Sequence, residues 1–290
     1  MTNDSLIVAA TTLLALTAFA GNSVLCRLAL GDGAMDPASF TLIRIAAGAL
    51  TLPFLLWIQK TPSHDVRTSG SWFGAACLLT YAVAFSYAYV QLESGVGALI
   101  LFGSVQITML LFALRAGEKL GLIKATGMLC AGAGLTLLLL PGSADNQNVS
   151  AIGFSLMVIA GIAWAGYTLL GAHSQSALRD TTFNFVRATV LALPLALVFL
   201  IAPPTATPAG IALAIASGAL TSGVGYAIWY AVLPRISRLQ AGVSQLSVPV
   251  ITALGGIIFI GEQVDARLVI AMTLTLAGIF ITLSRPTAQS

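Results

Sequence analysis

The chain has 290 residues, of which 58% are hydrophobic and only 8% are charged, and its formal net charge at pH 7 is +3. Soluble proteins carry roughly 25% charged residues, so this composition excludes a soluble protein. The small and dispersed net charge argues against a nucleic-acid partner.

Continuous apolar runs of about 20 residues, the length that a helix needs to cross a bilayer, recur along the chain. Strands of a membrane barrel would instead alternate apolar and polar residues. The runs predict an all-α integral membrane protein with ten transmembrane helices, the first of them too long for a cleaved signal peptide. In chain order the predicted spans are 5–26, 36–58, 70–91, 93–114, 120–140, 151–171, 181–201, 208–232, 239–260 and 266–284.

Lysine and arginine lie mostly on one side of these spans. Nine fall on the side of the N-terminus, namely Lys60, Arg67, Arg115, Lys119, Lys124, Arg179, Arg235, Arg238 and Arg285, and two, Arg27 and Arg267, fall on the other. Positive residues accumulate in cytoplasmic loops, so both termini are predicted to be cytoplasmic. The sequence has no His, Cys and carboxylate cluster with metal-site spacing and no glycine-rich phosphate loop, so no metal or cofactor is expected.

The two halves of the chain resemble each other at a shift of about 144 residues. The matching pairs are residues 40–44 with 183–187, 87–88 with 230–231, 117–118 with 261–262, Gly134 with Gly278, and Phe19 and Gly21 with Trp164 and Gly166. Each half holds five predicted spans, and an odd number inverts the second half relative to the first. We therefore predict two inverted five-helix repeats, residues 1–146 and 147–290, around a central cavity, as is typical of secondary transporters.

A family resemblance rests on this repeat and on residues of the second half: Trp164, Gly166, Pro249, Gly261, Glu262 and Gly278. The chain resembles the EamA-type, ten-helix members of the drug/metabolite transporter superfamily, and is most similar to the bacterial YddG-type exporters of aromatic amino acids. It departs from the pattern in the first half, where Val105 stands in place of a proline and Phe19 in place of a tryptophan. The resemblance implies a bacterial inner-membrane protein with spans 1, 3, 4, 6, 8 and 9 around the cavity and spans 5 and 10 at one side.

Polar side chains in the middle of a span need a partner or water, so they mark a candidate substrate site. Ser104 and Thr108 lie on one face of span 4, and Gln245 lies on the equivalent face of span 9. Gln245 and Asn22 are assigned to the cavity because a primary amide has four hydrogen-bonding sites, which one helix does not readily satisfy. For Ser104 and Thr108, helix packing with a bond to their own helix is an equal alternative.

Aromatic side chains well inside the spans form the second part of the predicted site. Tryptophan and tyrosine belong at membrane interfaces, whereas rings with a polar tip in mid-membrane suit a pocket for a partly apolar solute. Ordinary packing of the bundle is the alternative. The residues assigned to substrate binding on this ground are Tyr81, Trp164, Tyr167 and Tyr226. Phe19 is added as the repeat equivalent of Trp164, and Ser222 is added because it lies one turn before Tyr226 on the same face of span 8.

Arg44 and Arg187 are the only charged residues clearly inside the predicted spans, and the repeat makes them equivalent. Each lies about two turns from a membrane surface, so we expect both side chains to snorkel to the headgroups. A gate, or an anchor for a substrate carboxylate, is the alternative. Glu118 and Glu262 are expected to be structural loop residues that cap neighbouring helices. Pro249 is expected to break span 9 near the site, with a packing kink as the alternative.

These features predict a secondary transporter that exports small amphiphilic metabolites, amino acids including aromatic ones, by alternating access. The outward direction follows from the resemblance alone. No Asp, Glu or His lies near the middle of a predicted span, so facilitated diffusion is expected rather than ion coupling. The expected partners are the small-molecule substrate and the lipid bilayer, and the protein is expected to be a monomer or weak homodimer.

Two other functions remain open. One is the export of drugs or other metabolites. The other, from a different class, is an integral-membrane enzyme, and against it stands the lack of any nucleophile–histidine or paired-carboxylate arrangement near the membrane. The protein is therefore not expected to be an enzyme.

Overall fold

The computed structural model describes residues 3–58, 69–115, 121–137, 149–171, 174, 176–236 and 244–283. Within these ranges the regular structure is helical, and the one strand-like contact is an isolated antiparallel bridge between Met35 and Ala206. The prediction of an all-helical fold is therefore confirmed.

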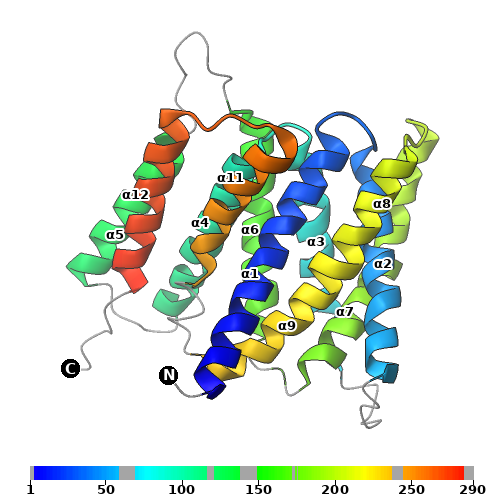
Figure 1. Ribbon diagram of the computed structural model, residues 1–290, viewed down its shortest axis with the longest axis horizontal. Coiled ribbons are helices and arrows are strands. Elements are labelled where there is room, and N and C mark those ends of the chain that lie inside the picture. The colour runs from blue at the N-terminus through cyan, green and yellow to red at the C-terminus, as the bar shows by residue number, and fades with distance from the viewer. Residues whose placement is uncertain are drawn as a thin grey trace.

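The helices lie side by side and run between the two ends of a bundle (Figure 1). The first half forms α1 (Asn3–Leu30), α2 (Pro37–Ile58), α3 (Trp72–Tyr89), α4 (Ser94–Arg115) and α5 (Leu122–Leu137). The second half forms α6 (Ala151–Gly171), α7 (Ala177–Ala192) with the 3-10 helix η2 (Leu193–Leu200), α8 (Pro208–Ala216), the π-helix η3 (Ser217–Val224), α9 (Gly225–Val232), the short η4 (Leu233–Arg235), α11 (Ser247–Ile260) and α12 (Ala266–Leu283). The beginning of α1 and the end of α12 lie at the same end, the lower one in Figure 1.

Seven helical segments in the described ranges are long and apolar enough to cross a membrane. They are Ser5–Leu30, Pro37–Ile58, Trp72–Tyr89, Ser94–Phe112, Ala151–Gly171, Ala177–Leu200 and Pro208–Val232. Three further apolar helices are shorter: Ala125–Leu137, Ser247–Ile260 and Ala266–Ile281. So many apolar helices indicate a multi-pass membrane protein.

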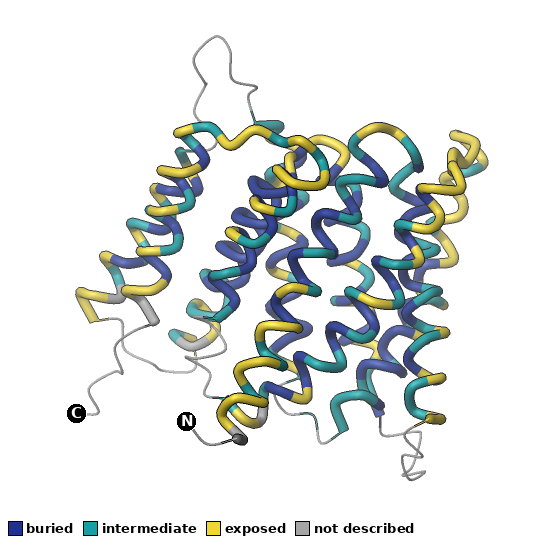
Figure 2. Tube along the Cα trace, in the orientation of Figure 1, coloured by how far each residue is buried: buried dark blue, intermediate teal, exposed yellow. Residues whose placement is uncertain are grey.

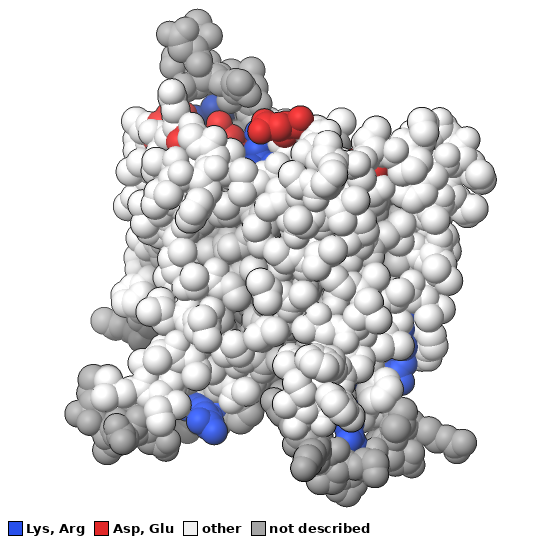
Figure 3. Space-filling view, turned by 45° about the vertical axis from the view of Figure 1, so that its right-hand side comes forward, with Lys and Arg blue, Asp and Glu red and all other residues white. Residues whose placement is uncertain are grey.

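The outer surface of the bundle suits a hydrocarbon environment. Figure 3 shows, on the visible face, a broad belt without Lys, Arg, Asp or Glu between two ends that carry them. On α2 the large residues Leu50, Phe54 and Trp57 are 76%, 56% and 75% exposed. Figure 2 shows that buried residues lie on the sides of the helices that face one another. The apolar exterior therefore faces lipid.

The pair α5 and α12 stands at one edge of the bundle (Figure 1). Small residues allow two membrane helices to approach closely, and the contact between this pair depends on them. A Cβ atom on Gly278 would collide with the backbone of Ala131, and one on Gly134 would collide with Thr275. The two helices of this pair therefore pack closely against each other, and they contact the rest of the bundle through α4, where a Cβ atom on Gly103 would lie 3.1 Å from the side chain of Leu135.

Two aspartates tie loops together at opposite ends of the bundle. Asp36, just before α2, accepts hydrogen bonds from the backbone N of Ser39 (2.8 Å) and of Thr205 (2.9 Å). Asp180, which is 144 positions later, in the first turn of α7, accepts one from Gly70 N at 2.8 Å. Each aspartate thus joins a helix of its own half to a loop of the other half. Partial burial would raise the pKa of Asp36, but its hydrogen bonds favour the charged form and hold that pKa below its usual range.

The backbone is irregular in two places. Residues 244–245 are helical, residue 246 forms a turn and α11 begins at Ser247, so the helix is interrupted three residues before Pro249, near where the sequence predicted a break. The second departure from α-helical geometry, which the sequence did not predict, lies in η3, where the N–H of Gly225 donates to the O of Leu220, five residues earlier. Such π-helical turns are rare and often occur at functional sites.

Candidate functional site

An aromatic cluster fills the centre of the bundle, where α1, α3, α6 and α9 meet. The rings of Tyr81 and Tyr226 lie 5.0 and 4.7 Å from that of Trp164, centroid to centroid. Phe19 lies 5.8 Å from both Trp164 and Tyr226, in the edge-on arrangement that aromatic pairs favour. None of the four residues is more than 5% exposed. We call the space between these rings the central chamber.

A hydrogen-bond network around the amide of Asn22 lines one face of the chamber. The Nδ2 of Asn22 donates to Tyr81 Oη at 3.1 Å. Its Oδ1 accepts from Ser217 Oγ at 2.7 Å and from Thr221 Oγ1 at 3.3 Å, and Ser222 Oγ lies 3.4 Å from the same oxygen. Because three hydroxyls of η3 converge on one oxygen of α1, the π-helical turn is part of this network.

Arg44 of α2 lies inside the same network and is only 1% exposed. Its Nε donates to Ser222 Oγ at 3.1 Å. Its Nη2 donates to Tyr81 Oη at 3.2 Å and to Tyr226 Oη at 3.1 Å. The guanidinium also lies 5.2 and 5.0 Å from the ring centroids of Tyr81 and Phe85. The prediction that Arg44 snorkels to the headgroups is therefore wrong, because its side chain is buried and binds hydroxyls of the core through Nε and Nη2.

The centre of the bundle is positively charged and rich in donors. The ion pair found within the described residues joins Arg27 to Glu262, away from Arg44. The Nη1 of Arg44 is buried without a hydrogen-bond partner, as are the indole Nε1 atoms of Trp164 and Trp229. A buried charge without a counter-ion is unfavourable, so this arrangement calls for a functional explanation.

Arg187 of α7, the repeat equivalent of Arg44, behaves as predicted. Its Nη1 donates to the backbone O of Ser69 at 2.8 Å. Its guanidinium lies 5.8 Å from the ring centroids of Trp72 and Phe183. Ser69 precedes α3 at the lower end of the bundle, so the side chain of Arg187 extends out of the interior.

The central chamber encloses a void of about 10 Å³, roughly the room that one water molecule needs. Its walls are Phe19, Asn22, Ser23, Tyr81, Phe85, Leu101, Phe102, Trp164 and Tyr226. A small-molecule site usually offers roughly 300 Å³ or more. In this conformation the void is therefore smaller than a typical small-molecule site.

The structure brings together six of the residues that the sequence assigned to substrate binding: Phe19, Asn22, Tyr81, Trp164, Ser222 and Tyr226. Tyr167 is also buried and packs beside the chamber, with its ring centroid 5.6 Å from that of Trp164.

The other three assigned residues lie apart from the chamber. Ser104 is buried where α4 meets α6, and a Cβ atom on Gly161 would lie 2.6 Å from its Cβ. Thr108 donates to Ser104 O at 2.7 Å, within its own helix, and lines a different hollow. Gln245 is buried just before α11 and does not line the void.

Sequence reasoning did not assign Arg44, Ser217 or Phe85 to the site. A signal for Arg44 was present, since it is a deep charge in a chain whose predicted spans hold no mid-span carboxylate to pair with it. Ser217 and Phe85 carry no such signal. Their positions depend on the π-helical turn and on the rotation of α3, which an apolar run does not encode.

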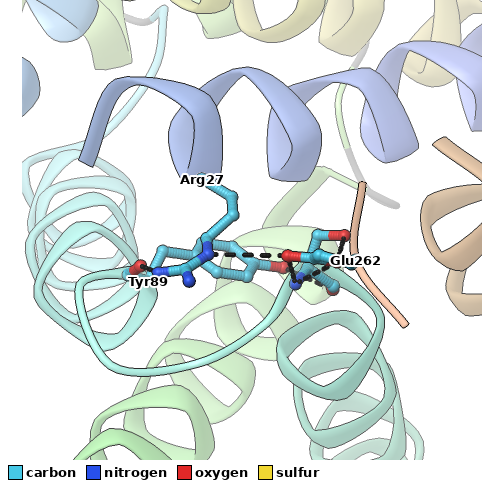
Figure 4. A network of polar contacts seen from close by, with 4 residues as sticks. Arg27, Tyr89 and Glu262 are labelled. Carbon is cyan, nitrogen blue, oxygen red and sulfur yellow. Dashed lines mark hydrogen bonds and ion pairs between the residues drawn. The ribbon is translucent and has the colours of Figure 1, made fainter. Parts of the chain in front are cut away.

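Polar contacts close the upper end of the bundle (Figure 4). Arg27 Nε lies 3.5 Å from Glu262 Oε1, and Arg27 Nη1 donates to Tyr89 O at 3.0 Å. Glu262 also accepts from the N and the Oγ of Ser94, at 2.8 and 2.5 Å. Glu262 therefore caps α4, as predicted, whereas Glu118 lies outside the described residues. We call these contacts between α1, α3, α4 and the loop after α11 the upper clasp.

The lower end of the bundle differs from the upper end. A hollow of about 500 Å³ opens there beside α4 and α6. It is lined by Thr108, Leu111, Phe112, Leu114, Arg115 and Ile162. In this conformation the described part of the chain is thus clasped at one end and hollowed near the other.

Comparisons with known proteins give the following matches. Residues 6–140 and 151–284 each match the EamA-like transporter family, so the family pattern occurs twice. The chain is 47% identical to an uncharacterized protein of Pseudomonas aeruginosa, over 94% of this chain and 93% of that one. It is 22% identical to a probable terminal-alkyne amino-acid exporter of Streptantibioticus cattleyicolor, over 84% of this chain and 83% of that one. A protein crystal structure with 21% identity matches with a TM-score of 0.65 over 94% of this chain and 97% of that one, which supports the fold.

Proposed function

The chain belongs to the EamA-like transporter family, and on this premise we propose that it is a secondary transporter of small amphiphilic metabolites, amino acids and aromatic amino acids among them. That one relative is a probable amino-acid exporter supports the substrate class. The proposed direction is export across a bacterial inner membrane. Membership of a transporter family agrees with the expectation that the protein is not an enzyme.

The observation that carries this proposal is the central chamber, because both halves of the chain build it. Phe19 and Tyr81 come from the first half, and Trp164 and Tyr226 come from the second. The hydroxyls of Tyr81 and Tyr226 meet at 3.3 Å. Since the halves touch through these side chains, a small rocking of one half against the other would widen the chamber, as alternating access requires.

We propose that the seven longer and three shorter apolar helices make ten crossings, arranged as two inverted repeats. Asp36 and Asp180 support the inversion, because they lie 144 positions apart and bind loops at opposite ends of the bundle. Basic residues at the lower end, among them Arg115, Arg179 and Arg235, support a cytoplasmic lower end that holds both termini.

A thiol-labelling experiment tests this topology. Arg235→Cys places a thiol at the lower end and Val264→Cys places one at the upper end, in a chain whose three native cysteines are replaced by alanine; both native side chains are exposed. In intact cells an impermeant reagent should label only Val264→Cys, and inside-out vesicles should reverse the result. Labelling of both sites from the same side contradicts the proposed topology.

Facilitated diffusion is the proposed mode of transport. The residues that line the void include no carboxylate and no histidine, and proton-coupled carriers usually use such a group. Purified protein in liposomes should therefore exchange labelled phenylalanine for internal phenylalanine, without changing it and without an imposed pH or sodium gradient. Accumulation driven by either gradient would contradict the proposed mode. Movement of a lipophilic cation instead of amino acids would favour drug export, and a chemically altered product would favour an enzyme.

A further inference from the structure

Resting on the proposed function, we infer that the transported solute carries a carboxylate and that Arg44, Tyr81 and Trp164 form the set of donors that binds it. The family membership and the size of the chamber do not specify this chemical group. The hydrogen bonds and the charge of the central chamber do.

Buried N–H donors of the chamber lack acceptors. The Nε and Nη2 of Arg44 are used within the core, but its buried Nη1 has no partner. The oxygen of Tyr81 already accepts from Asn22, Arg44 and Tyr226. The indole N–H of Trp164, in the wall of the void, is also without an acceptor. Ser23 Oγ, a neutral hydroxyl in the same wall, is likewise unpaired, so what the chamber lacks is an anionic acceptor.

The charge of the chamber points to the same ligand. A guanidinium stays protonated at any physiological pH, and the lining of the void includes no Asp or Glu. A carboxylate offers two oxygens that fit the planar fork of an arginine, and such charge-assisted hydrogen bonds are among the strongest in proteins. A solute carboxylate would therefore supply the missing acceptors and the missing counter-charge together.

Apart from Ser23, the remaining walls of the chamber are apolar. Phe19, Leu101 and Phe102 face the void and offer no hydrogen-bonding side-chain atoms. The substrate class is therefore a small carboxylate with an apolar or aromatic body. Amino acids and 2-oxo acids both belong to it. An amine that lacks the carboxylate does not, because it would face the charge of Arg44 with no acidic partner.

A purely structural Arg44 would give a different result. It would join α2 to α3, η3 and α9 through its hydrogen bonds, and its loss would weaken the transport of every solute equally. A residue that recognises the carboxylate must instead determine how solutes rank against one another. The ranking is therefore the measurement that distinguishes the two roles.

The experiment measures binding of labelled phenylalanine to the purified full chain, in competition with phenylpyruvate, phenylalaninamide and phenethylamine. Phenylpyruvate keeps the carboxylate and loses the amine, whereas the amide and the amine lose the carboxylate. The wild type, Arg44→Lys and Arg44→Gln are compared, with Arg187→Gln as the matched control. Counterflow in liposomes is measured in parallel. The wild-type series requires no variant to fold.

In the wild type, phenylpyruvate should compete with phenylalanine, while the amide and the amine should bind at least about 10-fold more weakly, the loss of one charge-assisted bond. Arg44→Lys should keep part of this preference, and Arg44→Gln should remove it. Arg187→Gln should match the wild type.

Equal competition by acid and amide in the wild type overturns the inference and leaves transport intact, as does an unchanged preference in Arg44→Gln. A preference for acids without counterflow supports the inference and contradicts the proposed function. Absence of binding by all four compounds contradicts both.

Discussion

Arg44 and Arg187 occupy equivalent positions in the two halves of the chain, yet their side chains end in opposite surroundings. Arg44 is 1% exposed and bonds to three hydroxyls in the core. Arg187 reaches the backbone O of Ser69 at the lower end of the bundle. The difference shows that the facing helices, and not the depth of an arginine along its own helix, decide whether the side chain snorkels.

The helix that faces Arg44 explains its burial. Gly218 of η3 lies so close to α2 that a Cβ atom there would collide with the backbone O of Arg44. A Cβ atom on Gly48, one turn further along α2, would collide with the ring of Phe185. Because α2 and η3 approach this closely, Ser222 is within reach of the Nε of Arg44. The irregular helix therefore supplies one buried acceptor, the hydroxyl of Ser222, that the other arginine lacks.

Replacing each arginine in turn by glutamine should give the largest difference in transport rate between two variants. Arg44→Gln removes charge-assisted bonds to Ser222, Tyr81 and Tyr226, each worth about 1.5–3 kcal/mol, and leaves their hydroxyls buried. We expect the initial rate of phenylalanine counterflow to fall by about 10- to 150-fold. Arg187→Gln removes a half-exposed contact and should change the rate by less than about 3-fold. Equal losses in both variants would mean that the two sites are equivalent after all.

The next largest effect is expected from Asn22→Leu, which should lower thermal stability because it removes the hydrogen-bond network beside Arg44. The amide of Asn22 joins α1 to α3 and η3 through bonds to Tyr81 and Ser217, and leaving such buried groups unpaired costs about 1–3 kcal/mol each. Thermal unfolding in detergent should shift to clearly lower temperature. Thr17→Val is the control, since this exposed residue bonds only to its own helix at Leu13. If both variants unfold at the same temperature, the network does not stabilise the chamber.

Glu262→Gln sharpens the comparison by removing the counter-ion of a third arginine. Arg27 has the carboxylate partner that Arg44 lacks, at 3.5 Å. Losing that charge should destabilise the protein by about 1 kcal/mol and should loosen the upper clasp. The rate at which an impermeant reagent labels Cys26, which is 0% exposed, should then rise. Unchanged labelling of Cys26 would show that the clasp does not control access from the upper end.

The smallest effect is expected from the loop contacts of Asp36. Its pKa lies below its usual range, so the stabilisation is present at neutral pH and is lost as the pH falls through about 4 and below. Asp36→Asn should lower stability at pH 7 by less than Glu262→Gln does and should flatten the acid side of the stability profile. Thermal unfolding between pH 7 and pH 4 measures both effects. If the variant loses as much stability between pH 7 and pH 4 as the wild type does, other carboxylates cause that loss.

The helices and much of the chamber follow from the sequence. Length and hydropathy define the apolar runs, and aromatic side chains in the middle of a span either pack between helices or line a pocket. Trp164 and Tyr226 were predicted on this ground, Asn22 was predicted from its buried amide, and the three residues meet in the chamber. The position of Arg44 was not predictable from its own helix, since the hydroxyls that hold it come from residues up to 182 positions away. The π-helical turn in η3 was likewise not predictable, because its sequence reads as an ordinary apolar helix with small residues.

The most direct test of the central claim, that the chamber between the halves is the substrate site, uses Trp164 as a reporter. Trp57, Trp72 and Trp229 are replaced by phenylalanine, so that fluorescence comes only from the tryptophan in the wall of the void. Titration with phenylalanine should change this fluorescence saturably, and Arg44→Gln in the same background should abolish the change while Arg187→Gln should not. Undiminished counterflow without any change in Trp164 fluorescence would place the substrate path elsewhere and contradict the account.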